Sequence, residues 1–127
     1  MKIELAKTEI IHFVGIGGIG MSGLALIMKG MGFNVQGSDV IINKNIERLR
    51  KDRIKVNFKH SKKNITRATI IVISSAIKKN NPELVEARNK HLPIYKRGEM
   101  LANIVSLTKN IVVTGSHGKT TTTSLLA

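Results

Sequence analysis

A chain of 127 residues has the length of one domain, because domains contain roughly 100–200 residues. It has no cysteine, which excludes a disulfide framework and a thiolate metal site and is typical of a reducing cytoplasm. The formal net charge of +13 raises the question of an anionic partner, but three Phe, one Tyr and no Trp are too few aromatic residues for a base-stacking surface.

Much of the positive charge lies between residues 44 and 63, where nine Lys or Arg residues stand against Glu47 and Asp52. We interpret this stretch as a solvated helix face, and we expect neither a nucleic-acid partner nor a membrane partner. The apolar run Ile10–Met28 is nearly long enough to cross a bilayer. Five glycines lie within nine of its positions, however, and each costs about 1 kcal/mol inside a helix. We therefore predict a strand, a turn and a helix here.

The first half of the chain alternates between β-rich and helical patterns. A buried strand is predicted at Ile10–Val14, a helix at Ile19–Met31 and a second strand at Phe33–Gly37. A basic amphipathic helix is expected at Asn45–Lys51, and Ile54–Phe58 alternates like a strand. The succession of strand, glycine turn, helix and strand has the length of one βαβ unit.

The second half continues the alternation. Ala68–Ser74 has an apolar centre typical of a parallel strand that is buried on both faces, and Pro82 can begin a helix. A short strand is predicted at Ile94–Tyr95 and a helix at Glu99–Leu107, and a last strand is expected at Asn110–Thr114.

Alternating strands and helices predict an α/β fold, a Rossmann-like open parallel sheet with helices on both faces. The last strand and the glycine-rich loop that follows it would begin a second, ATP-binding (ATPase) domain. We predict that residues 1–108 form the first domain and that residues 109–127 are the truncated start of the second. We expect so short a piece of that second domain to have no enzymatic activity.

The segment Gly15–Gly20 fits the pattern G-x-G-x-x-G between a predicted strand and a predicted helix, which is the context that the pattern requires. Gly15 allows a tight turn, Gly17 allows the backbone to approach a pyrophosphate, and Gly20 allows close packing of the helix. Asp39 lies 19 residues after Gly20, where an acid can bind a ribose. The motif indicates a nucleotide but does not distinguish NAD, FAD and a UDP-sugar. A glycine-rich turn without a ligand is the alternative.

A second glycine-rich loop, Gly115–Thr120, follows the last predicted strand and is two residues shorter than the standard phosphate loop. The shorter loop can bind phosphate in the same way as the standard one. Backbone N–H groups surround phosphate, Lys119 reaches the β- and γ-phosphate oxygens, and Thr120 can bind Mg²⁺. A polar, Thr-rich linker is the alternative.

Other polar residues are candidates for ligand contact, and each also has a possible structural role. Ser74 and Ser75 end a strand at the edge where open α/β sheets bind ligands, although a hydroxyl can also satisfy backbone groups. Arg97 can pair with a phosphate or with Glu99, and His60 is left open between a ligand contact and none. We interpret His12 as a structural residue and His91 as a surface residue.

Six blocks, spread over nearly the whole chain and in the family's order, resemble the Mur ligases of peptidoglycan synthesis. They are His12–Gly23, Gly37–Asp39, Ser74–Ile77, Asn81–Glu83, Arg97–Leu101 and Thr114–Thr123. The doubled-glycine turn and His117 in the second loop favour an alanine-adding member over ligases that act later. One departure is Lys59, which stands where family members have Gly before His60.

The resemblance implies a three-domain, cytoplasmic, ATP-dependent ligase that joins L-alanine to UDP-N-acetylmuramate through an acyl phosphate. It implies ATP and Mg²⁺ as cofactors, Lys119 as a catalytic residue and Thr120 as a metal ligand. The residues implied to bind the UDP moiety are Gly15, Gly17, Gly18, Ile19, Gly20, Met21, Ser22, Ser38, Asp39, His60, Ser74, Ser75 and Arg97. Those implied to bind ATP are Gly115, Ser116, His117, Gly118, Lys119, Thr120 and Thr121.

Two rival classes are weighed against this interpretation. An NAD-binding domain of an oxidoreductase or regulatory protein would use Asp39 equally well, but it gives no role to Lys119. A basic nucleic-acid-binding module predicts an affinity that falls steeply with salt. For the nucleotide site, we expect Gly17→Val to abolish binding and to leave most of the fold intact.

Overall fold

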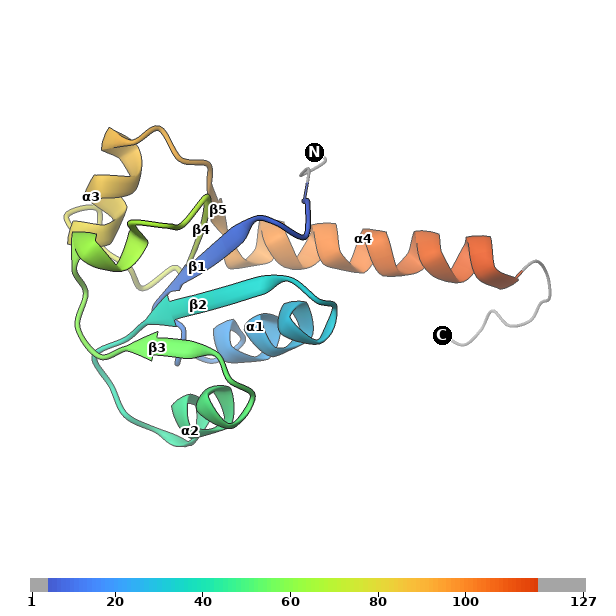
Figure 1. Ribbon diagram of the computed structural model, residues 1–127, viewed down its shortest axis with the longest axis horizontal. Helices are drawn as coiled ribbons and strands as arrows, with labels where there is room; N and C mark the ends of the chain where they lie inside the picture. The colour runs from blue at the N-terminus through green and yellow to red at the C-terminus, as the bar shows by residue number, and fades with distance from the viewer. Residues whose placement is uncertain (1–4, 117–127) are drawn as a thin grey trace.

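The structure of the protein is a computed structural model, which describes the backbone of residues 5–116 and the side chains of residues 5–107. Five parallel strands form one open sheet in the order β3-β2-β1-β4-β5 (Figure 1). The strands are β1 (Ile10–Val14), β2 (Asn34–Ser38), β3 (Lys55–Asn57), β4 (Ile70–Ile73) and β5 (Ile94–Lys96). This is the Rossmann-like order, and the predicted fold class is confirmed.

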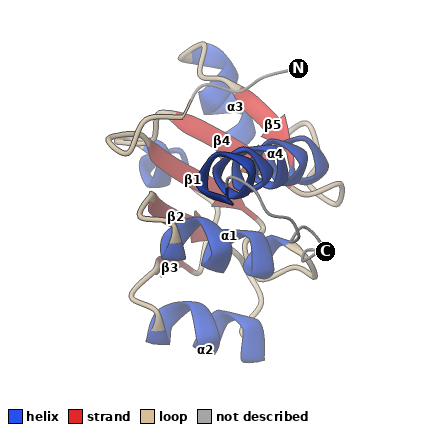
Figure 2. Cartoon of the chain, turned by 90° about the vertical axis from the view of Figure 1, so that its right-hand side faces the viewer, coloured by secondary structure: helices blue, strands red, loops and turns tan. Residues whose placement is uncertain are grey.

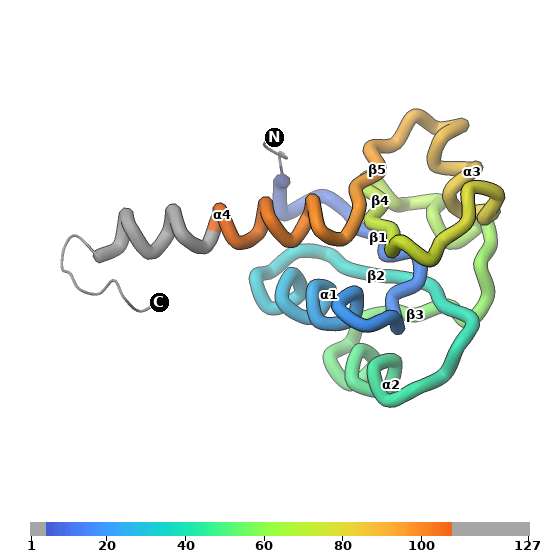
Figure 3. The backbone as a smooth tube through the Cα atoms, turned by 180° about the vertical axis from the view of Figure 1, so that it is seen from behind, coloured from blue at the N-terminus to red at the C-terminus, as the bar shows by residue number. Residues whose placement is uncertain are grey.

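Helices connect the strands and cover both faces of the sheet (Figure 2). They are α1 (Met21–Gly30), α2 (Lys44–Lys51), α3 (Pro82–Asn89) and α4 (Arg97–Ser116), with the 3₁₀ helix η1 (Lys62–Ile65). On one face, α1 packs against both α2 and α4 and lies between them (Figure 3). On the other face, α3 packs against η1.

Each face of the sheet has its own apolar core, because side chains alternate along a strand. Ile11 and Phe13 of β1 are buried toward α1, α2 and α4, where the larger core lies. Val14 and Ile71 are buried toward α3 and η1, in a smaller core. Full burial of a side chain of this size contributes about 1.5–3 kcal/mol. The smaller core shares its face of the sheet with the buried polar side chains described below.

Two asparagines begin helices that the sequence predicts. The side chain of Asn43 accepts a hydrogen bond from the N–H of Ile46 at 3.0 Å and caps α2. The side chain of Asn81 accepts one from the N–H of Glu83 at 2.9 Å and caps α3, with Pro82 in the first turn. Such caps typically contribute about 1 kcal/mol.

The backbone of α4 is helical through Ser116, so the strand expected at Asn110–Thr114 is wrong for this structure. A lone strand leaves its N–H and C=O groups unpaired, whereas a helix pairs them within the segment. The five described strands all belong to the first sheet and offer no second sheet for this segment to join. Within the described residues, no helix is long and apolar enough to cross a membrane.

Candidate functional site

The glycine turn connects the end of β1 to the start of α1, as predicted. Gly15 and Gly20 both adopt φ of 82°, a conformation that favours glycine. The N–H groups of Gly15 and Ile16 donate to the carbonyl oxygen of Ser38 at 2.9 and 3.0 Å. The turn is therefore attached to the carboxyl end of β2 as well as to that of β1.

The start of α1 presents backbone donors that have no partner among the described residues. The N–H groups of Ile19, Gly20 and Gly23 have no acceptor in the part of the chain that the structure describes. Gly20 is the N-cap and provides no side-chain cap, and no acidic residue occupies the first turn. The helix dipole adds positive potential at this end. A phosphate group can bind here, with Ile19 97% exposed beside it and Met21 and Ser22 buried beneath.

Ser74 and Arg97 lie against the glycine turn. A Cβ placed on Gly15 would be 3.3 Å from Oγ of Ser74, and one placed on Gly20 would be 3.2 Å from Nε of Arg97. The turn after β1 and the turn after β4 thus meet where the strand order reverses, which is where open α/β sheets bind ligands. Ser75 follows Ser74 and is exposed.

Arg97 does not pair with Glu99. Within the described residues Arg97 has no ion pair, and Glu99 instead accepts a hydrogen bond from the N–H of Lys96 at 2.8 Å. The half-buried guanidinium at Gly20 is therefore available to an anion, which favours the phosphate alternative of the sequence analysis.

Asp39 holds the turn together. Its Oδ2 accepts a hydrogen bond from the N–H of Gly17 at 2.8 Å, and its Oδ1 accepts from the N–H groups of Val40 and Ile41 at 2.7 and 3.2 Å. Only 8% of the residue is exposed. Both carboxylate oxygens are already engaged with backbone, so the arrangement favours an anchor more than a ribose acceptor.

The space beside Gly17 is occupied by the protein. A Cβ on Gly17 would lie 2.8 Å from Cδ1 of Ile46 and 2.9 Å from Oδ2 of Asp39. The expectation that Gly17→Val leaves most of the fold intact is therefore corrected, because a side chain here would displace the turn's anchor and a core residue of α2. Gly18 is less constrained, since its nearest contact would be an ordinary 3.4 Å.

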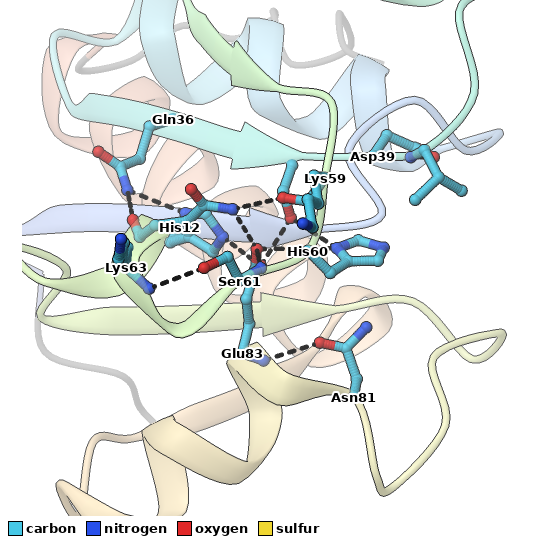
Figure 4. A network of polar contacts seen from close by, with 12 residues as sticks. His12, Gln36, Asp39, Lys59, His60, Ser61, Lys63, Asn81 and Glu83 are labelled. Carbon is cyan, nitrogen blue, oxygen red and sulfur yellow. Dashed lines mark hydrogen bonds and ion pairs between the residues drawn. The ribbon is translucent and has the colours of Figure 1, made fainter.

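A buried polar network lies under the carboxyl end of β2, with the carboxylate of Glu83 at its centre (Figure 4). Glu83 is fully buried. Oε1 contacts Nε2 of His12 at 2.7 Å and Oγ of Ser38 at 2.6 Å. Oε2 accepts from the N–H of Ser61 at 3.0 Å and from Nδ2 of Asn64 at 2.6 Å. Four donors from three separate segments therefore converge on one carboxylate.

The protonation of Glu83 follows from these contacts. Burial would raise its pKa, but the hydrogen bonds from His12, Ser38 and Asn64 lower it from 4.5 to about 2. Glu83 is therefore a carboxylate at neutral pH and can only accept hydrogen bonds.

The orientation of His12 is set by Gln36. Nε2 of Gln36 lies 2.8 Å from the carbonyl oxygen of Asn64, which can only accept, and 2.9 Å from Nδ1 of His12. The Gln36 amide therefore donates to Nδ1 of His12, and Nε2–H of His12 donates to Glu83. His12 is structural, as interpreted from the sequence, and it is fully rather than partly buried.

Ser38 and His60, both predicted as site residues, contact each other. Oγ of Ser38 lies 2.9 Å from Nδ1 of His60, and the side chain of His60 is 17% exposed. Lys59 adopts no left-handed conformation, and its carbonyl oxygen accepts from Nδ2 of Asn64 at 2.7 Å. A glycine is not required at position 59, so this departure from the family pattern leaves the loop intact.

Glu83 is the residue that sequence reasoning missed. Because Glu83 follows Asn81-Pro82, it looks like an ordinary acidic residue in the first turn of a helix. Its partner His12 is 71 positions away. The one available signal was the apolar strand β1 interrupted by a histidine, which requires a buried partner.

Most of the second predicted loop lies outside the described residues. Gly115 and Ser116 belong to the backbone of α4. His117, Gly118, Lys119, Thr120 and Thr121 lie outside the described residues. Within the described residues, no group of three potential ligands could hold a metal ion.

The parallel sheet, the uncapped helix start and the glycine turn at the reversal of strand order define an α/β domain of the Rossmann-like class, the class in which nucleotides bind at this edge. Comparison with protein-family models matches residues 10–109 to the Mur ligase family, catalytic domain. The chain belongs to the Mur ligase family.

Similarities to individual proteins support membership of this family. The chain is 86% identical, over all 127 residues, to a UDP-N-acetylmuramate–L-alanine ligase of Pelagibacter ubique (strain HTCC1062), and it spans 27% of that protein's length. A crystal structure of UDP-N-acetylmuramate-alanine ligase from Thermotoga maritima matches 76% of this chain and 23% of its own, with 36% identity and a TM-score of 0.73. A UDP-N-acetylmuramate:L-alanyl-gamma-D-glutamyl-meso-diaminopimelate ligase from Neisseria meningitides matches 73% of this chain and 30% of its own, with 31% identity and a TM-score of 0.67.

Proposed function

We propose that this chain is the substrate-binding first part of an ATP-dependent ligase that joins L-alanine to UDP-N-acetylmuramate in peptidoglycan synthesis. The observation that carries the proposal is the 86% identity over the entire chain to a ligase of that name. Because the chain spans about a quarter of that relative, the complete reaction belongs to a longer protein.

The part of the reaction assigned to this chain is binding of the UDP moiety. The N–H groups of Ile19, Gly20 and Gly23, which have no acceptor within residues 5–116, would bind the diphosphate. Arg97 would neutralise part of its charge. Ser74 and Ser75 would contact the ligand from the turn after β4. Asp39 would keep Gly17 and the turn in place.

We propose a domain boundary near residue 108. One observation supports it, because the family match ends at residue 109. Residues 109–127 would then begin the ATP-binding domain.

ATP and Mg²⁺ complete the proposal for the longer protein. Together they would supply the activated phosphoryl group that turns the substrate carboxylate into an acyl phosphate, which the amine of L-alanine then attacks. Residues Gly115–Thr121 are proposed to bind ATP, with Lys119 at the phosphates and Thr120 at the metal. A cytoplasmic location is proposed from the absence of cysteine and the nucleotide substrates.

The nucleic-acid alternative finds little support on the surface. Phe13 and Phe33 are buried, and Phe58 lies under the guanidinium of Arg50 at 4.5 Å. The fourth aromatic residue, Tyr95, packs against the larger core. Among the described residues, the exposed basic side chains on α2 therefore have no free aromatic partner for stacked bases.

Isothermal titration calorimetry tests the proposal. We expect this chain to bind UDP-N-acetylmuramate and UDP but not NADH. Arg97→Ala should weaken UDP binding about tenfold, as expected for one charge-assisted contact, whereas Arg67→Ala, at an exposed position, should not. Binding of NADH in preference to UDP would favour the oxidoreductase alternative. An affinity for DNA that falls steeply between two salt concentrations would favour the nucleic-acid alternative.

A further inference from the structure

The customary ribose acceptor of a βαβ nucleotide site is already in use in this protein. That acceptor is an acid at the carboxyl end of the second strand, which here is Asp39. Its two oxygens accept three backbone N–H groups, and the residue is nearly covered. A carboxylate has about four acceptor sites, so this covered one has little capacity left, and a ribose at the end of β2 would gain a hydrogen bond from another acceptor.

His60 lies at this end of β2, and its partners fix which ring nitrogen carries hydrogen. Glu83 is a carboxylate and only accepts, so the single hydroxyl hydrogen of Ser38 points to Oε1 of Glu83. Oγ of Ser38 must then accept in its contact with His60, and the donor is Nδ1–H of His60. Neutral His60 is thus held with hydrogen on Nδ1 and a lone pair on Nε2.

The free nitrogen is accessible. Nε2 of His60 has no partner within the described residues, and the side chain is partly exposed. In Figure 4 the ring of His60 projects away from the crowded centre of the network, on the side of Asp39 and of the strand ends. A ligand group at this edge would meet an acceptor whose orientation is already fixed.

We propose that Nε2 of His60 accepts a hydrogen bond from a ribose hydroxyl of the substrate nucleotide, and that Glu83, acting through Ser38, is the positioning residue that holds His60 in this state. The proposal rests on the proposed function, because it concerns the nucleoside of the same ligand. With the diphosphate at the start of α1, the adjoining ribose reaches the end of β2, as in other βαβ nucleotide sites. Ordering of His60 before binding lowers the entropic cost of the contact.

The ribose contact is tested by calorimetry with UDP and 2′,3′-dideoxyuridine diphosphate at pH 8. The wild-type chain should bind UDP about tenfold more tightly than the dideoxy compound, the effect expected for one hydrogen bond. His60→Phe should lose that preference and bind both compounds alike. The same substitution at exposed His91 should keep the preference.

The positioning role is tested by nitrogen NMR of the imidazole rings in the same chain. Wild-type His60 should carry hydrogen on Nδ1 and none on Nε2 at pH 8. Ser38→Ala should reduce this bias, because Nδ1 of His60 then keeps only Oε2 of Glu83 at 3.7 Å, and it should weaken UDP binding. Ser61→Ala, which keeps the backbone donor to Glu83, should do neither. Dispersed spectra of both variants would show that they remain folded.

The outcomes separate the two proposals. If wild-type binds UDP but discriminates no better than His60→Phe, the ribose contact is wrong and the proposed function stands. If His60 carries hydrogen on Nε2, or keeps its state in folded Ser38→Ala, the positioning role is wrong. If the wild-type chain binds no UDP, the proposed function fails and the ribose contact fails with it.

Discussion

The backbone N–H of Gly17 and the carboxylate of Asp39 are joined by a 2.8 Å hydrogen bond across 22 positions of sequence. This bond attaches the glycine turn to the end of β2, and Oδ1 of the same carboxylate accepts the next two backbone N–H groups. The turn therefore keeps its shape through a side chain outside it.

Removal of the Asp39 carboxylate should lower both the stability of the fold and its affinity for a nucleotide. We predict that Asp39→Ala lowers the free energy of unfolding by about 1–3 kcal/mol, because three backbone donors lose their acceptor. Urea unfolding would measure the loss. Asp52→Ala, at an exposed position, is the matched control and should change stability by less than about 0.5 kcal/mol. Equal stability of the two variants would show that the bond carries little energy.

Two glycines of the turn should respond differently to the same substitution. Gly17→Ala should destabilise the fold by about 1–3 kcal/mol, because the methyl group would meet Ile46 and Asp39 below 3.0 Å. Gly18→Ala, with its nearest contact at 3.4 Å, should cost much less. Thermal unfolding of both variants checks this order, and the reverse order would contradict the packing described for the turn.

Stability should depend on pH through Glu83. Its pKa is lowered to about 2 in the folded chain from 4.5, so the folded state loses this contribution as pH falls from about 4.5 toward 2. Above pH 4.5 the contribution is fully present, with about 3 kcal/mol as an upper limit. Urea unfolding of the wild type and Glu83→Gln at pH 7, 4 and 3 measures it. The difference in the free energy of unfolding between the wild type and Glu83→Gln should shrink as the pH falls. A constant difference would show that the Glu83 carboxylate does not stabilise the fold.

A third glycine, Gly37 of β2, tests the packing of the sheet. A Cβ there would lie 2.6 Å from the side chain of Ile16 and 2.7 Å from the carbonyl oxygen of Phe13. Gly37→Ala should therefore destabilise the fold by about 1–3 kcal/mol. Gly23→Ala adds the same methyl group in α1 with no neighbour within 4 Å, and should be neutral or stabilising by up to about 1 kcal/mol.

Local patterns predicted most of the fold. The apolar strands, the glycine turn and Pro82 each depend on neighbouring residues, and each occurs where expected. The Glu83 network was not predictable, because its members come from β1, β2, the loop before η1 and α3 and meet only in the folded chain. The strand expected at Asn110–Thr114 failed for a related reason, since a strand depends on partners that local sequence does not specify.

The sequence predicted which candidate residues lie close together, and their contacts with a ligand stay a prediction. As expected, Ser74 and Arg97 lie beside the glycine turn. The geometry of Asp39 and Ser38 favours internal partners, because each side chain bonds within the protein. Residue type and spacing indicate which groups gather at a strand end, but not which of them face a ligand.

The most direct test of the central claim is a ¹H–¹⁵N NMR titration of this chain with UDP-N-acetylmuramate, with NADH as the comparison. We predict saturable shifts of the amide signals of Ile19, Gly20 and Gly23 with UDP-N-acetylmuramate, and none of that size with NADH. Shifts of these amides with NADH alone, or shifts with UDP-N-acetylmuramate confined to residues distant from the turn, would contradict it.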